Sequence, residues 1–387
     1  MVQISNTDKQ LSNLFGIGLL FAFILPHTST GLLLINPLFC ILYQCFRQNR
    51  IWYNKSIFLI IILFIPLLFN LNQELGQKSI SSFITILLYI VCFPIVWRVK
   101  VSNVWLYIIL SLIFLSQIIY VLKIPYLIDF LDTYYPIQDT YANQISVIKR
   151  NIRFSTITDY RLGGLYRNPN QCSRALTMLM SFYIINNYEK PVRSTMFFVI
   201  LSIVAILFTG SRTGLLVGGI IIAIDIFYIK KVPSGIRAIY IIFLIGAFIY
   251  FILIGSGMYR GLDMSSGFNN SMSLKYEVFL DYLHQERSVL RLMVGNFDPK
   301  KYVASSSDLL GIFDTDYGNL IFQFGFLGFI AILYYLFTIF KKMDRVGRSF
   351  FVLLLWMFSS TIVCSYRAFF IFMLELSVIY SDSRMRK

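Results

Sequence analysis

The sequence predicts an all-α polytopic membrane protein with about twelve transmembrane helices, and three observations support this fold class. Of its 387 residues, 57% are hydrophobic and 14% are charged, whereas a soluble domain carries about 25% charged residues. Apolar stretches close to the roughly 20 residues that cross a bilayer recur along the whole chain. Lysine and arginine are concentrated in alternate loops between these stretches. These observations exclude an ordinary water-soluble enzyme, a disordered protein and a disulfide scaffold.

Each apolar stretch is expected to form one transmembrane helix. In order, the expected spans are residues 11–25, 31–46, 56–69, 80–97, 104–122, 171–187, 195–209, 213–229, 236–254, 317–340, 349–364 and 368–380. The sequence shows no internal repeat and no additional soluble domain. Residues 1–387 are therefore expected to form a single integral membrane domain.

The distribution of basic residues predicts the topology. The chain has 34 Lys and Arg against 19 Asp and Glu, a net charge of +15. More than half of the basic residues lie in one set of loops and at the two ends of the chain, whereas the alternate short loops carry one each, namely Lys78, Arg212 and Arg367. Cytoplasmic loops are the ones enriched in Lys and Arg, so both termini are expected in the cytoplasm. The positive charge is mostly a topology signal, and no nucleic-acid partner is expected.

Two long segments, residues 123–170 and 258–316, lie on the opposite, outer side of this topology and hold most of the acidic residues. In the second segment, residues 274–293 are expected to form an amphipathic helix. Its apolar side would carry Leu274, Val278, Tyr282, Val289 and Leu290. Such a helix either lies on the outer leaflet of the membrane, in the interface between lipid and water, or packs on the helix bundle.

The first candidate site is the segment from Arg161 to Asn170, with the sequence RLGGLYRNPN, followed by a span that contains Arg174. A helix is expected to begin at Pro169, with Asn168 as its cap. Because a helix N-terminus favours anions, added guanidinium groups would make a site for a phosphate-rich lipid head group. The alternative is that these arginines only reach for lipid phosphates. The candidate residues are Arg161, Arg167, Asn168, Asn170 and Arg174.

The second candidate site is the outer turn from Gly210 to Gly214, with the sequence GSRTG. Arg212 has no acidic neighbour in the sequence and opens a helix at the membrane surface. A lone arginine in an outer hairpin runs against the positive-inside bias, and an ion near the membrane is a functional hypothesis by default.

The third candidate site is the segment from Asp314 to Asn319, with the sequence DTDYGN, at the outer end of a span. Asp314 and Asp316 are spaced to hold a divalent cation, to act on a sugar hydroxyl as a general base, or to cap the following helix. Additional candidate ligand contacts in the second outer segment are Arg260, Lys275 and Arg291.

In these motifs the chain resembles the O-antigen polymerase and ligase superfamily, the lipid-dependent glycosyltransferases often called Wzy-like and WaaL-like. The family pattern R-x-x-G-x-x-x-N-P-N corresponds to Arg161, Gly164, Asn168, Pro169 and Asn170. The family's Ser-Arg turn corresponds to Ser211 and Arg212. A further family pattern consists of His or Asp, an aromatic residue three positions later, and then G-x-x-G. It corresponds to Asp314, Tyr317, Gly325 and Gly328. The resemblance covers about half of the chain.

The resemblance implies a GT-C-like fold in the bacterial inner (cytoplasmic) membrane, with both long segments and the active site on the periplasmic side. It implies transfer of a glycan from undecaprenyl pyrophosphate to another lipid-linked repeat unit. Arg161 and Arg212 would stabilise the departing pyrophosphate, and Asp314 or Asp316 would orient or deprotonate the acceptor hydroxyl. The expected substrate-binding residues are Arg167, Asn168, Asn170, Arg174, Arg260, Lys275, Arg291 and Tyr317. No metal and no other cofactor is expected, and a chain-length regulator is a further partner to consider.

Two alternatives stay open at this point. Ligases of this family typically have His at the position of Asp314, so the aspartate favours a polymerase over an O-antigen ligase. A polysaccharide flippase or other secondary transporter also has about twelve spans. A transporter is expected to show repeat symmetry and polar residues in the middle of its spans, whereas this chain has long outer segments and no visible repeat.

Overall fold

The structure is a computed structural model of the chain. It describes residues 6–25, 54–69, 83, 87, 101–135, 162–166, 169–187, 190–226, 234–235, 237–239, 241–242, 245–246, 280, 282–284, 288–296, 316–344, 347–349 and 351. Within these residues the regular elements are helices and no strand occurs. The predicted all-helical class is confirmed for this part of the chain, and the twelve-span topology stays a prediction.

Seven of the described helices overlap seven of the expected spans. They are α1 (Asn6–Ile24), α4 (Asn54–Phe69), α6 (Asn103–Val121), α9 (Pro169–Asn186), α10 (Val192–Thr209), α11 (Arg212–Ile224) and α16 (Asp316–Phe340). The spans expected at residues 31–46, 80–97, 236–254, 349–364 and 368–380 lie wholly or largely outside the described residues.

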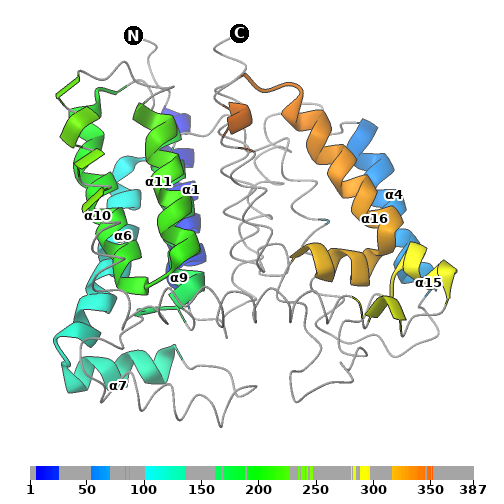
Figure 1. Cartoon of the computed structure of the whole chain (residues 1–387), viewed down its shortest axis with the longest axis horizontal. Coiled ribbons are helices and arrows are strands. Elements are labelled where there is room, and N and C mark those ends of the chain that lie inside the picture. The colour runs from blue at the N-terminus through cyan, green and yellow to red at the C-terminus, as the bar shows by residue number, and fades with distance from the viewer. Residues whose placement is uncertain are drawn as a thin grey trace. The chain divides into compact units, whose positions relative to one another are not determined.

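The chain divides into two compact units. The first, Met1–Leu32 with Val99–Met264, contains α1, α6, α9, α10 and α11, together with a shorter helix α7 (Pro125–Tyr134). The second, Leu33–Arg98 with Ser265–Lys387, contains α4, α16 and a short helix α15 (Val289–Val294) (Figure 1). That residues 1–387 form one integral membrane domain stays a prediction.

Helix α9 is the core helix of the first unit. It packs against α6, α10 and α11, and nearly all of its side chains from Cys172 to Ile185 are buried. Two of its buried hydroxyl groups bond back to the helix: Thr177 donates to Arg174 O at 2.8 Å and Ser181 to Met178 O at 3.0 Å.

A polar cluster joins the start of α6 to the end of α9. Asn103 and Asn187 exchange two amide hydrogen bonds, of 2.7 and 2.8 Å. One turn along, the hydroxyl groups of Tyr107 and Tyr183 lie 3.2 Å apart. Side-chain hydrogen bonds of this kind hold helices together in apolar surroundings, where few other partners exist. The cluster fixes α6 antiparallel to α9, and so brings the far end of α6 to the beginning of α9.

In the second unit, α16 packs against α4 and α15. The ring of Phe83 lies between α4 and α16. Its centroid is 5.1 Å from the ring centroid of Phe64 on α4 and 6.1 Å from that of Phe324 on α16. A Cβ at Gly328 of α16 would lie 3.5 Å from the side chain of Leu63 of α4. These aromatic and aliphatic contacts hold the middle of α16, from which its first turns extend toward the third candidate site.

Two of the described helices are long and apolar enough to cross a membrane. They are α6 over its full length, Asn103–Val121, and the segment Leu320–Phe340 of α16. Both correspond to spans that the sequence predicts. Their length matches the roughly 20 residues that a bilayer core requires.

Candidate functional site

The loop that carries the first motif is held against α6 and α10. It is described at residues 162–166. The backbone N–H of Leu162 donates to Phe208 O in the last turn of α10, at 2.9 Å. The N–H of Leu165 donates to Ser116 Oγ of α6, at 3.2 Å. The loop thereby has a fixed position at the end of α6, and Arg161 is the residue that precedes it in the sequence.

Gly164 and Gln117 explain why this loop fits so closely. Gly164 has φ +56°, a conformation that glycine adopts without steric cost, and a Cβ there would overlap Ser116 Oγ. Gln117, fully buried, donates from Nε2 to Ala205 O of α10 at 3.0 Å and to Leu162 O at 3.4 Å. Ser116 and Gln117 are two neighbouring polar side chains in an apolar span, and they anchor the motif loop. They are not among the residues predicted from the sequence, although a Ser-Gln pair within a span is a visible signal.

The second motif forms a tight turn between α10 and α11. Gly210 ends α10 with φ +61°, the left-handed conformation common after a helix C-terminus. Ser211 then caps α11, because its side chain accepts a hydrogen bond from the N–H of Gly214 at 3.2 Å. Helix α11 consequently begins at Arg212, as the sequence predicts. The side chain of Arg212 lies outside the described residues.

The second turn of α9 and the first turn of α11 are in direct contact. A Cβ at Gly214 would overlap Ser173 Oγ, so the absence of a side chain lets the two helices meet there. Ser173 is buried, and its hydroxyl has no hydrogen-bond partner among the described residues. Within the described residues this hydroxyl is thus an unused donor near the start of α9, and leaving such a buried group unpaired is costly.

The first two motifs therefore come together at one end of the first unit. Leu162, next in sequence to Arg161, bonds to Phe208, which lies four residues before Arg212. Helix α9 begins at Pro169, as the Asn-Pro-Asn sequence predicts, and reaches Gly214 of α11 through Ser173. In the sequence the two motifs are separate candidate sites. In the structure a backbone hydrogen bond links the segment after Arg161 to the segment before Arg212.

The electrostatics of this junction favour an anion. Two helix N-termini lie there, each at the positive end of a helix dipole, where the first N–H groups have no partner within the helix itself. Neither α9 nor α11 has an acidic residue in its first turn. Arg174 is half-buried in the second turn of α9. Arg161, Arg167 and Asn168, and the side chain of Asn170, lie outside the described residues, so their roles stay predictions.

We predict that a side chain at Gly214 would force this junction apart. Gly214→Ala is expected to lower the stability of the purified protein by about 1–3 kcal/mol, the usual effect of overpacking, measured by thermal unfolding in detergent. Gly218→Ala, one turn further along α11, is the matched control, because a Cβ there meets only the ends of flexible side chains. Adding Ser173→Ala to Gly214→Ala removes the overlapping hydroxyl and should restore part of the loss. Equal effects at Gly214 and Gly218 would contradict the close contact.

The third motif lies at the beginning of α16. The helix starts at Asp316, and the half-buried ring of Tyr317 makes an edge contact with Phe329, with centroids 6.2 Å apart. Asp314 and the side chain of Asp316 lie outside the described residues. Capping, base and metal-binding roles for the two aspartates therefore all stay predictions. Among the described residues, no three His, Cys, Asp or Glu are grouped to hold a metal ion.

Helix α16 is interrupted at Gly325, the first glycine of the G-x-x-G pattern. Gly325 has φ +65° and ψ −179° inside the helix, a region open essentially to glycine alone. The end of α15 fills the interruption. The N–H of Asn296 donates to Phe322 O at 2.8 Å, and a Cβ at Gly325 would overlap the carbonyl of Met293. Gly295 is equally crowded, because a Cβ there would overlap the backbone of Gln323 and Gly325.

The sequence predicts one unbroken helix over residues 274–293, and this prediction is wrong because the helix is interrupted at Ser288. Ser288 has an extended backbone, φ −88° and ψ 110°, and its side chain caps a new helix, α15. The expected apolar side is also divided. Tyr282 is buried against Ile321 and Phe322 of α16, as the packed alternative predicts, whereas Val289 and Leu290 are exposed. Serine caps compete with a continuing helix, and the periodicity alone does not reveal this break.

Of the remaining candidate contacts in the second outer segment, only Arg291 is described. It lies on α15 with an exposed side chain. Arg260 and Lys275 lie outside the described residues. The ligand-binding roles of all three therefore stay predictions.

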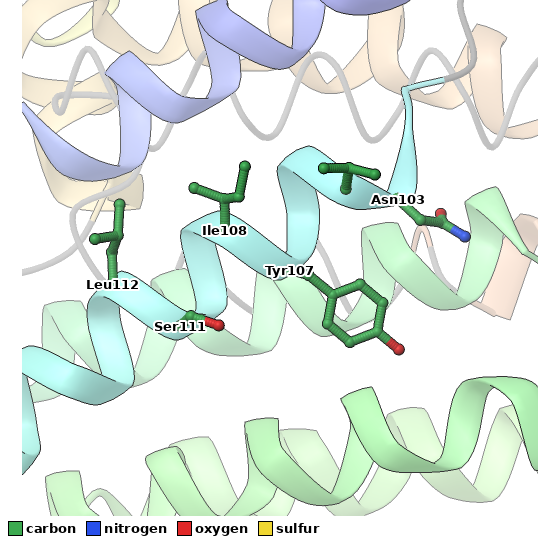
Figure 2. Close-up of a pocket in the computed structure, with 6 residues that line it drawn as sticks. Asn103, Tyr107, Ile108, Ser111 and Leu112 are labelled. Carbon is green, nitrogen blue, oxygen red and sulfur yellow. The ribbon is translucent and has the colours of Figure 1, made fainter.

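An open cavity of about 510 Å³ lies along α6, on the side where Val104, Ile108 and Leu112 are exposed, and is distinct from the motif junction. It is lined by Asn103, Val104, Tyr107, Ile108, Ser111 and Leu112 (Figure 2). These residues occupy the half of α6 nearest Asn103, whereas Ser116 and Gln117, which hold the motif loop, lie toward the other end. No predicted site residue lines the cavity.

Comparisons of the chain with models of protein families, with curated proteins and with solved structures found no match. The resemblance carried by the three motifs stays a prediction. The geometry described above adds that two of these motifs meet at a pair of helix N-termini.

Proposed function

We propose that this protein is a polysaccharide polymerase of the bacterial inner membrane, acting on glycans carried by undecaprenyl pyrophosphate. The observation that carries the proposal is the junction of α9 and α11, where the Arg161 loop and the Ser211-Arg212 turn meet. A pyrophosphate is the anion that such a site suits best, because helix N-termini and arginines both favour phosphate oxygens.

The membrane location is supported by the exposure of α6 as well as by its length. Only 33% of its apolar window is buried, whereas the core helix of a soluble protein is mostly buried. Its exposed side chains are apolar and follow one face of the helix, at Val104, Ile108, Leu112 and Leu115. Such a face is stable against lipid and unfavourable against water. We extend this to about twelve spans, with both termini in the cytoplasm and the motif junction on the periplasmic side.

The proposed reaction forms one glycosidic bond and breaks one. The acceptor hydroxyl attacks the anomeric carbon of the donor glycan, and the bond from that carbon to the pyrophosphate oxygen breaks. Negative charge grows on the leaving pyrophosphate. Arg161 and Arg212 would stabilise this charge, and electrostatic stabilisation is often the main source of an enzyme's rate enhancement. They cannot act as bases, because a guanidinium group stays protonated.

The acceptor proton passes to a carboxylate in this proposal, either Asp314 or Asp316. Ser173 is a further donor to the pyrophosphate, since its buried hydroxyl has no partner among the described residues. Arg167, Asn168, Asn170 and Arg174 bind the lipid-linked substrate at the start of α9. Arg260, Lys275, Arg291 and Tyr317 contact the glycan chains in this proposal.

A comparison of glycan lipids in a strain that lacks the gene tests the proposed function. Loss of a polymerase leaves surface lipid capped with single repeat units. Accumulation of undecaprenyl-linked polymer would instead identify an O-antigen ligase, and repeat units trapped on the cytoplasmic side would identify a flippase. Either of these two outcomes would overturn the proposal. Restoration of the polymer ladder by the gene supplied on a plasmid is the control.

A further inference from the structure

Helix α7 continues directly from the membrane-length helix α6 but runs crosswise to it (Figure 1). The connecting residues stay bonded to the last turns of α6: the N–H of Leu122 donates to Ile118 O at 2.8 Å and that of Ile124 to Ile119 O at 3.3 Å. Lys123 between them has φ +52°. This left-handed residue changes the chain direction, and Pro125 then starts α7 at a position where proline is favoured. Helix α7 therefore begins at the very end of α6.

One face of α7 carries a row of exposed aromatic side chains, which we call the aromatic stripe. Tyr126, Phe130 and Tyr134 are spaced by four residues, so they lie on one side of the helix. Their side chains are 88%, 53% and 57% exposed. The rings of Phe130 and Tyr134 are in contact, with centroids 4.6 Å apart, and Leu127 beside them is also exposed. The stripe contains no charged side chain.

The other sides of α7 have different surroundings. Leu131 is only 6% exposed and attaches the helix to the first unit. Asp129 and Thr133 are exposed, and the Thr133 hydroxyl donates to Asp129 O at 2.7 Å. The helix thus has one side against protein, a polar edge at Asp129 with Thr133 between it and Tyr126, and an aromatic stripe that the described protein does not cover.

Lipid is the occupant that these observations favour for the stripe. Helix α7 starts where the apolar, exposed end of α6 stops, at Val121 and Leu122. On a membrane-spanning α6, that end is the boundary between hydrocarbon and head groups. Tyrosine and other amphipathic aromatics are enriched at this boundary. Amphipathic helices lie there with their apolar face roughly 5–10 Å into the head-group region.

We propose that α7 lies flat in the outer, periplasmic interface of the inner membrane, with the aromatic stripe in contact with lipid. The inference rests on the membrane-spanning part of the proposed function. Such an anchor fixes the depth of the outer end of α6, where Ser116 and Gln117 hold the loop that follows Arg161. It thereby sets the height of the motif junction relative to the lipid phosphates, which is what an enzyme with a lipid pyrophosphate substrate requires.

Photo-crosslinking of the full chain in vesicles of phosphatidylethanolamine and phosphatidylglycerol tests this inference. A benzophenone amino acid is placed, one at a time, at position 108 on the exposed face of α6, at position 130 in the aromatic stripe, and at position 129 on the polar edge of α7, which lies about 100° around the helix from position 130. Lipid adducts are then measured by mass spectrometry. We expect position 130 to form adducts at a level comparable to position 108, and severalfold more than position 129.

The three positions separate the possible failures. Adducts at 108 without adducts at 130 would overturn the inference for α7 and leave the membrane-spanning fold intact. An adduct from 130 to a second copy of the chain, or to a bound glycan, would also overturn it. No adducts at 108 would contradict the membrane-spanning fold itself. Because all three positions are exposed, the bulky probe is accommodated without disturbing the core.

Discussion

Gly325→Ala is expected to lower the thermal stability of the protein more than Gly214→Ala does. The residue has φ +65° and ψ −179°, and strain of this kind costs about 1–3 kcal/mol for other residues. The added Cβ would also overlap the carbonyl of Met293 and approach the N–H of Gly295. Both are backbone groups that cannot rotate away. We expect the combined loss from strain and overlap to exceed about 3 kcal/mol, seen as a large fall in the melting temperature in detergent.

The matched control for Gly325→Ala is Gly246→Ala, because a Cβ at Gly246 meets no described residue within 4 Å. Gly246→Ala should leave the melting temperature almost unchanged. Gly295→Ala should behave like Gly325→Ala, since each glycine lies against the backbone of the other. A stable Gly325→Ala protein would contradict the docking of α15 in the interruption of α16.

Arg212→Ala is expected to abolish long-chain polysaccharide without removing the protein from the membrane. Loss of one group that stabilises developing charge typically reduces the rate roughly 100-fold or more. Arg212→Lys should retain part of the activity, because lysine keeps the charge but cannot make the same two-pronged contact with phosphate. The readout is the polymer ladder in a strain whose own copy of the gene is deleted.

The control for Arg212→Ala is Arg237→Ala, which removes one exposed arginine from the end of the expected span 236–254 that the topology places at the cytoplasmic side. It should leave the ladder unchanged. Protein levels in the membrane fraction are measured for all variants. A normal ladder from Arg212→Ala at a normal protein level would overturn the proposed role of this arginine.

The long helices were predictable from the sequence because their signal is local. Runs of apolar residues located α6 and α16 to within a residue or so at each end. The Pro169 start of α9 is also predictable, since proline is favoured at the first helical position, and the sequence also places Arg212 at the start of a helix, as α11 shows. Local composition was sufficient for these features.

Features that depend on tertiary contacts were not predicted. Helix α7 has ten residues, too few for a membrane span, so the apolar pattern places it only within a long outer segment. The break at Ser288 and the interruption at Gly325 are both stabilised by the docking of α15 on α16. The interruption needs the partner backbone at residues 293–296, which no pattern within α16 reveals.

The candidate site was predicted as three motifs but not as an arrangement. The junction of the first two depends on the bond from Leu162 to Phe208 and on the contact of Gly214 with Ser173. These residues are 46 and 41 positions apart in the sequence, and nothing local links them. Ser116 and Gln117 hold the loop from a third helix. Position 214 needs a residue without a side chain, and only its neighbour on α9, Ser173, explains why.

The most direct test of polysaccharide polymerisation uses the purified full chain in lipid vesicles. The substrate is the lipid-linked oligosaccharide extracted from the deletion strain, and the products are followed by gel electrophoresis and by mass spectrometry of the released lipid. The proposed reaction predicts a ladder of polymer together with one free undecaprenyl pyrophosphate for each bond formed, with neither product from Arg212→Ala. Intact substrate after incubation with the folded, membrane-inserted protein would contradict it.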